Sequence, residues 1–127
     1  MVDLYEFKII RDEYNTEYVV CQNSHLDCVE EVDDKTEFEA LENHRHLLDK
    51  IRKNEFTRLF PIAESLGKSL LGCLKRDFAN KHFVVFVSLR VGDSLIVRFH
   101  QKWDGEEPYY NPGDFSDSEE KVFMFEG

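Results

Sequence analysis

The feature that most constrains the fold is an alternating run of β-branched and aromatic residues between Lys81 and Trp103. Its apolar side chains fall at odd-numbered positions on both sides of a turn signal at Gly92 and Asp93. A period of two is typical of a strand with one buried face, and two such runs around a Gly-Asp turn predict a β-hairpin. The predicted buried set is Phe83, Val85, Val87, Leu89, Val91, Leu95, Val97, Phe99 and Trp103.

The turn of this hairpin must keep both apolar sets on one face of the sheet. A two-residue loop would place Leu89 opposite Ile96 and bring Arg98 under the apolar face, because a slip of one residue inverts every side chain. We therefore expect an odd-length turn or a bulge across residues 92–94. The second, more polar face would then carry Ser88, Arg90, Arg98, His100 and Lys102.

The segments before this hairpin predict two more strands and two helices. Short alternating runs over 4–11 and 17–22 predict a second hairpin. Apolar residues at helical spacing predict helices over 36–53 and 61–78. Asp34-Lys-Thr-Glu37 has the spacing of a capping box, and the alternative is that Thr36 is the cap. The buried stripe of the second helix would contain Ile62, Ala63, Leu66, Leu70, Cys73, Leu74 and Phe78.

The C-terminal part predicts a long loop over 104–120 and a final strand over 121–127. Gly67 and Gly72 each weaken the second predicted helix by about 1 kcal/mol relative to alanine. They indicate either a close approach of another backbone or two tolerated surface glycines. Because helices and strands are segregated along the chain, we expect an α+β fold, with an antiparallel sheet of about five strands and two helices packed on one face.

Length and cysteine content limit the class of protein. With 127 residues, the chain is long enough to bury a single core, so we expect one domain over 1–127. Its three cysteines are odd in number and lack zinc or redox spacing, which predicts free thiols. The start of the chain has no secretion signal and no segment is long and apolar enough to span a membrane. We expect a soluble cytoplasmic protein that is a monomer or weak dimer.

The acidic charge is concentrated in two segments. The chain has a net charge of -10, but segments 27–42 and 104–120 each carry -7, so the remainder carries +4. This distribution disfavours binding to nucleic-acid phosphates and favours a cationic partner.

Histidine and arginine supply the only candidates for metal or ligand chemistry. On a helix, His44 and His46 would point about 200° apart and could not share one ion. A metal site would need an extended backbone here together with His25, His82 or His100, and we expect no metal and no cofactor. Arg98 and His100 on the polar sheet face could bind an anionic ligand or act as acid and base, in a pocket that includes Phe86. The alternative is a partly solvated face on which charged stems cover Val84 and Phe86.

The predicted loop is the strongest candidate for a binding surface. It combines tyrosines with carboxylates, a composition that protein interfaces favour for anchoring and steering. The alternative is a solvated acidic loop whose aromatic rings pack on the end of the hairpin. The candidate partner-binding residues are Trp103, Asp104, Glu106, Glu107, Tyr109, Tyr110, Asp114 and Phe115.

The segments FHQKWDGEEPYYNPGDF (99–115) and EKVFMFEG (120–127), within a small acidic α+β chain, resemble the immunity proteins with which bacteria neutralise their own contact-dependent or polymorphic toxins. This resemblance implies a stoichiometric inhibitor, without catalytic activity, that binds a cognate toxin domain, often a basic nuclease. A small enzyme or ligand-binding domain with a pocket near Arg98 and His100 is the leading alternative. A regulatory adaptor is a third.

Overall fold

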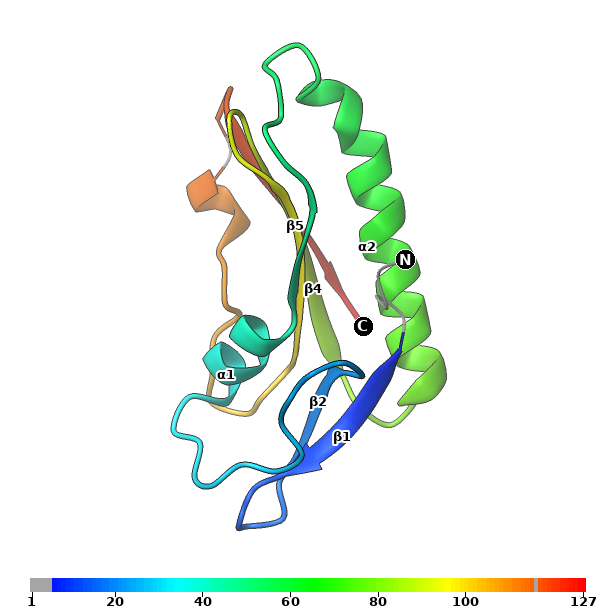
Figure 1. The fold of residues 1–127 in the computed structure, drawn as a ribbon, viewed down its shortest axis with the longest axis vertical. Helices are drawn as coiled ribbons and strands as arrows, with labels where there is room; N and C mark the ends of the chain where they lie inside the picture. The colour runs from blue at the N-terminus through cyan, green and yellow to red at the C-terminus, as the bar shows by residue number, and fades with distance from the viewer. Residues whose placement is uncertain (1–5, 116) are drawn as a thin grey trace.

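A computed structural model describes residues 6–115 and 117–127 of the chain. The described residues form an α+β fold with six strands in two antiparallel sheets (Figure 1). The elements are β1 (Phe7–Arg11), β2 (Glu17–Cys21), α1 (Lys35–Glu42), β3 (His44–Leu48), the 3-10 turn η1 (Thr57–Leu59), α2 (Phe60–Asp77), β4 (Phe83–Arg90), β5 (Leu95–Gln101), the 3-10 turn η2 (Pro112–Phe115) and β6 (Glu120–Glu126). The α+β class is confirmed, but the single five-stranded sheet is wrong.

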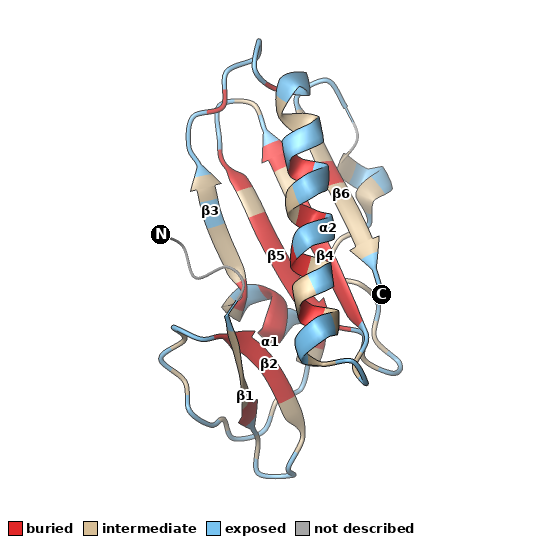
Figure 2. Cartoon of the chain, turned by 90° about the vertical axis from the view of Figure 1, so that its right-hand side faces the viewer, coloured by how far each residue is buried: buried red, intermediate tan, exposed pale blue. Residues whose placement is uncertain are grey.

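The predicted central hairpin is formed by β4 and β5. Val87 lies opposite Val97 and Leu89 opposite Leu95, so odd positions face odd positions. The turn is therefore longer than two residues, as expected, and Gly92 adopts a positive φ of 80° within it. The four-stranded sheet has the order β3-β5-β4-β6, and the two-stranded sheet β1-β2 lies beside one end of it (Figure 2).

Helix α2 covers the odd-numbered face of this sheet. Pro61 lies in its first turn, where its missing N–H is harmless. Ala63, Leu70 and Leu74 are fully buried against β4 and β5 residues. Ile62, which the periodicity placed in the buried stripe, is 51% exposed.

The two helical glycines differ in their surroundings. A Cβ built on Gly67 would lie 2.1 Å from Cε2 of Phe125, whereas one on Gly72 would meet no atom within 4 Å. Gly67 thus permits a close approach, but of a side chain rather than a backbone. Gly72 is a tolerated surface glycine.

The predicted helix over 36–53 ends at Glu42. Asp34 caps it as expected, since its Oδ1 accepts a hydrogen bond from the Glu37 amide at 2.9 Å. The buried Asn43 then bonds the backbone of β2 through both side-chain atoms, accepting from Cys21 N at 3.0 Å and donating to Val19 O at 2.8 Å. This fixed position turns the chain away from the helix, and residues 44–48 pair with β5 as an edge strand.

The even-numbered face of the sheet is also buried, so the prediction of two helices on one face is wrong. Helix α1 and the segment 104–115 lie on the side of the sheet opposite α2 (Figure 1). Val84 and Phe86 are fully buried, and Arg98 and His100 are almost fully buried. The predicted polar character of this face survives only at exposed positions such as Arg90 and Lys102.

The N-terminal hairpin supplies apolar groups to two clusters. Val19 and Cys21 join the main core under α2, whereas Ile10, Tyr18 and Val20 pack against Phe38 and Trp103. The predicted first strand began at residue 4, but residues 4 and 5 lie outside the described part of the chain. Cys21, Cys28 and Cys73 are free thiols. Within the described residues, neither helix has the length and apolar character needed to cross a bilayer.

Candidate partner-binding surface

The candidate surface begins where β5 ends, at Trp103. The Trp103 indole N–H donates a 2.8 Å hydrogen bond to Oε1 of Glu39 on α1. Its ring lies 5.5 Å from that of Tyr18 on β2. Trp103 is therefore a half-buried part of the core rather than the free anchor that its composition suggested.

The tyrosines of the loop pack on the even face of the sheet. Tyr109 and Tyr110 lie against the Arg98 guanidinium. Their ring centroids are 4.8 and 5.5 Å, respectively, from Cζ of Arg98. The Tyr110 ring also makes edge-on contacts at 5.3 Å with both Phe86 and Phe115. Both tyrosines and Phe115 are half-buried, like Trp103, so these rings cover the sheet and keep a smaller part of their surface exposed.

The pocket predicted near Arg98 and His100 is filled by this cover. Nη1 of Arg98 donates to the Ala40 carbonyl of α1 at 2.8 Å. Nε2 of His100 accepts from the Tyr109 amide at 3.1 Å, and Nδ1 lies 2.7 Å from the Gln101 carbonyl oxygen. Since an amide can only donate, the proton of His100 sits on Nδ1, and burial lowers the pKa of this neutral imidazole.

Glu106 joins the loop to the first turn of α1. Its carboxylate accepts hydrogen bonds from the Thr36 amide at 2.7 Å and the Lys35 amide at 3.3 Å. Partial burial disfavours the ionised form, but these bonds outweigh it and lower the pKa of Glu106. Glu106 is thus a cap for orphan amides at the start of α1.

The two acidic segments of the sequence meet at this junction. A depression of about 360 Å³ is lined by Asp34, Thr36 and Glu37 from the first segment, and by Glu106, Glu107, Pro108 and Tyr109 from the second. We call these seven residues the acidic face. Asp34 and Glu106 are held as helix caps. Glu37 and Glu107 are exposed, and among the described residues neither forms an ion pair.

A second depression lies on the other side of Glu107 and Pro108. It has a volume of about 420 Å³ and is lined by Glu107, Pro108, Tyr110, Asn111, Pro112 and Met124. Because the two depressions share Glu107 and Pro108, these residues form a ridge between an acidic hollow and a more apolar one. Asp104 and Asp114 are exposed but line neither hollow.

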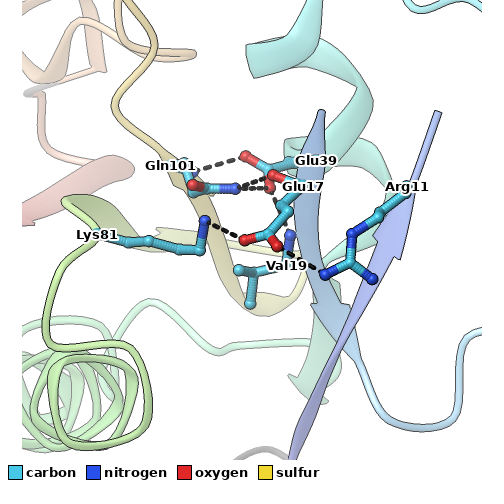
Figure 3. A network of polar contacts seen from close by, with 6 residues as sticks. All are labelled: Arg11, Glu17, Val19, Glu39, Lys81 and Gln101. Atoms are coloured by element: carbon cyan, nitrogen blue, oxygen red, sulfur yellow. Dashed lines mark hydrogen bonds and ion pairs between the residues drawn. The ribbon is translucent and has the colours of Figure 1, made fainter. Parts of the chain in front are cut away.

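Sequence reasoning missed the buried carboxylate under this surface. Glu39 is 0% exposed and accepts hydrogen bonds from Val19 of β2 and from Gln101 of β5 (Figure 3). It also accepts one from Trp103. Burial raises its pKa to about 7, although the hydrogen bonds to Gln101, Val19 and Trp103 oppose this change. No spacing signal marks Glu39, because it lies between Phe38 and Ala40 on a helix whose apolar positions are irregular.

The two histidines of β3 lie on a strand rather than on the predicted helix. Because residues 44–48 are extended rather than helical, the rings of His44 and His46 lie 5.6 Å apart instead of pointing in different directions. Across residues 6–115 and 117–127, no group of three or more His, Cys, Asp or Glu side chains could hold a metal ion.

Comparison with known proteins finds no match: no protein family, curated protein or solved structure is similar to this chain. The function is therefore inferred from the geometry of the surface and the character of the sequence.

Proposed function

We propose that this chain is a cytoplasmic immunity protein that neutralises a cognate toxin domain by stoichiometric binding. A basic nuclease is the toxin class that its acidic charge best complements. The observation that carries the proposal is the convergence of both acidic segments on one hollow, the acidic face, beside a more apolar hollow. Exposed Glu37 and Glu107 offer carboxylates to lysine or arginine side chains of the toxin. Tyr109, Tyr110 and Pro108 offer apolar contact beside them.

The inhibition would be physical rather than chemical. A toxin nuclease presents cationic groups to phosphates, so an acidic surface competes for the same groups and accelerates encounter by steering. The contact between half-buried tyrosines and the toxin would slow dissociation, as aromatic anchors do in protein interfaces. The residues on either side of the ridge are already held in place, since Tyr109 packs on Arg98 and Glu106 accepts a hydrogen bond from Thr36 of α1, which reduces the entropy lost on binding.

The test uses a candidate toxin domain, chosen from the genes that neighbour this one, and a pair of matched variants. The Glu37→Gln, Glu107→Gln double variant removes the two free carboxylates of the acidic face. The Glu30→Gln, Glu31→Gln double variant makes the same charge change at exposed positions outside it. Association and dissociation rates are measured by surface binding at several salt concentrations, and protection is measured as growth of cells that express the toxin domain.

Removing the acidic-face carboxylates should lower the association rate about 3- to 10-fold at low salt, with a smaller effect at high salt because charges are screened. The control pair should retain most of the wild-type rate, and it should protect cells fully. Failure of the wild-type chain to bind or to protect would reject the proposed function. Equal losses of association rate in the two double variants would mean that the toxin contacts a surface other than the acidic face.

A further inference from the structure

Glu39 is a buried carboxylate whose four hydrogen-bond partners are all donors. Oε1 accepts from Gln101 N at 2.7 Å and from Trp103 Nε1 at 2.8 Å. Oε2 accepts from Val19 N and from Gln101 Nε2, both at 2.8 Å. No described lysine, arginine or histidine forms an ion pair with it. The ionised form therefore depends on neutral N–H groups that come from β2 and from the end of β5.

Protonation of this carboxylate creates a conflict, because a carboxylic acid needs an acceptor for its own O–H. The backbone amides of Val19 and Gln101 and the indole of Trp103 can only donate. The Gln101 side chain is the one neighbour in this set that carries both a donor and an acceptor. If its amide turns over, its oxygen accepts the new proton from Oε2 of Glu39.

The same rotation would break a second bond. Nε2 of Gln101 also donates to the Glu17 carbonyl at 2.9 Å, and so links β5 to β2. Glu17 is itself held in place by Lys81 at 3.0 Å and Arg11 at 2.7 Å (Figure 3). Turning the amide would therefore reverse the direction of the bond between the sheet and α1, and it would remove the bond between the sheet and the N-terminal hairpin.

We propose that Glu39 and Gln101 form a proton-sensitive latch between the N-terminal hairpin and the four-stranded sheet. In the ionised state, Gln101 bridges Glu39 and the Glu17 carbonyl, and the hairpin is tied to β5. In the protonated state, the proton comes from solvent, Oε2–H of Glu39 donates to the turned Gln101 amide, and the bond to Glu17 is released. Trp103, at the start of the partner-binding segment, keeps its bond to Oε1 in both states.

Among the titratable groups around the latch, Glu39 is the one whose protonation changes near neutral pH. On β2, hydrogen bonds from Lys81 and Arg11 lower the pKa of Glu17, so its carboxylate stays charged. Burial raises the pKa of Tyr18, so its hydroxyl stays neutral. On β5, burial lowers the pKa of His100. Beside the start of α1, the carboxylate of Glu106 faces Lys35 and its pKa is lowered. By contrast, burial raises the pKa of Glu39 to about 7.

The latch is tested on the free chain by NMR between pH 5 and pH 9. The carboxyl carbon of Glu39 and the side-chain amide of Gln101 should titrate together, with one midpoint near pH 7. In the Glu39→Gln variant, the Gln101 amide signal should lose this titration and stay near its low-pH position, because an amide at position 39 supplies a permanent donor. Glu31→Gln, at an exposed position outside the acidic face, is the control, and it should keep the wild-type titration.

A second measurement keeps the test decisive if Glu39→Gln folds poorly. The pKa of Glu39 in the folded state lies above the usual glutamate value of 4.5, so the folded state binds more protons than the unfolded state between the two values. Stability from this group is therefore greatest below pH 4.5 and falls as the pH rises to about 7. Urea unfolding of the wild-type chain across this range should follow that slope.

A Gln101 amide signal that ignores pH while Glu39 titrates would overturn the latch, and so would a Glu39 carboxyl signal without a midpoint near neutral pH. Any effect of the latch on partner binding, through α1 and Trp103, rests on the proposed function. The NMR test does not involve the partner, so failure of the latch and failure of the immunity function are distinguishable.

Discussion

The two faces of the four-stranded sheet are both buried, but by different means. The odd face is covered by α2, a regular helix whose apolar residues pack on Val85, Val87 and Val97. The even face is covered by the irregular segment 104–115 and by α1. Its buried surface includes the polar side chains of Arg98 and His100.

This difference teaches that a polar residue on a strand does not by itself mark a solvated face. Arg98 and His100 are buried because α1 and the covering segment contact most of their polar atoms, although Nε of Arg98 has no hydrogen-bond partner among the described residues. The tyrosine rings and a helix carbonyl contact the guanidinium, and a backbone amide donates to the imidazole. Such groups are available from an irregular segment, whose backbone amides are not used within a helix or sheet.

The largest expected effect tests whether the two faces are equally buried. Val84→Asp on the even face and Val87→Asp on the odd face should each destabilise the chain by about 3 to 5 kcal/mol, because each buries an unpaired charge. Arg90→Ala, at an exposed position of the same strand, should change stability by less than about 0.5 kcal/mol. Urea unfolding measures all three. A mild effect of Val84→Asp alone would mean that the irregular cover opens easily.

A smaller effect tests the cover itself. Tyr110→Ala should destabilise the chain by about 2 to 3 kcal/mol, less than a fully buried aromatic residue would, since the ring is half-buried and packs on Phe86 and Phe115. Tyr14, which is 67% exposed, supplies the matched control, and Tyr14→Ala should be nearly neutral. Equal unfolding midpoints for the two variants would show that Tyr110 does not hold the cover in place.

The smallest effect tests the helix-covered face. Gly67→Ala should destabilise the chain by about 1 to 2 kcal/mol, because the new Cβ would collide with the Phe125 ring. Gly72→Ala should instead stabilise it by about 0.5 to 1 kcal/mol through helix propensity, since open space surrounds this position. Thermal unfolding of both variants shows whether each substitution lowers or raises the stability of the chain. A stabilising Gly67→Ala would mean that Phe125 moves aside at little cost.

Several elements were predictable because their signals are local. The odd-to-odd register of β4 and β5, the Asp34 cap and the start of α2 near Pro61 all follow from neighbouring residues. The end of α1 was not predictable from local signals. It depends on Asn43, whose side chain bonds the backbone of β2, more than twenty residues earlier in the chain.

The candidate surface also combines features that the sequence predicts with features that depend on the tertiary structure. The sequence alone identified two acidic segments and a loop rich in tyrosine, because charge and residue type are read directly from the chain. Only the tertiary structure brought Glu37 and Glu107 to one hollow, assigned Glu106 to a helix cap and Trp103 to the core, and buried Glu39 among four donors. The physical reason is that these contacts join segments some twenty to seventy residues apart in the chain, and no periodicity within one segment encodes which distant donor a side chain will meet.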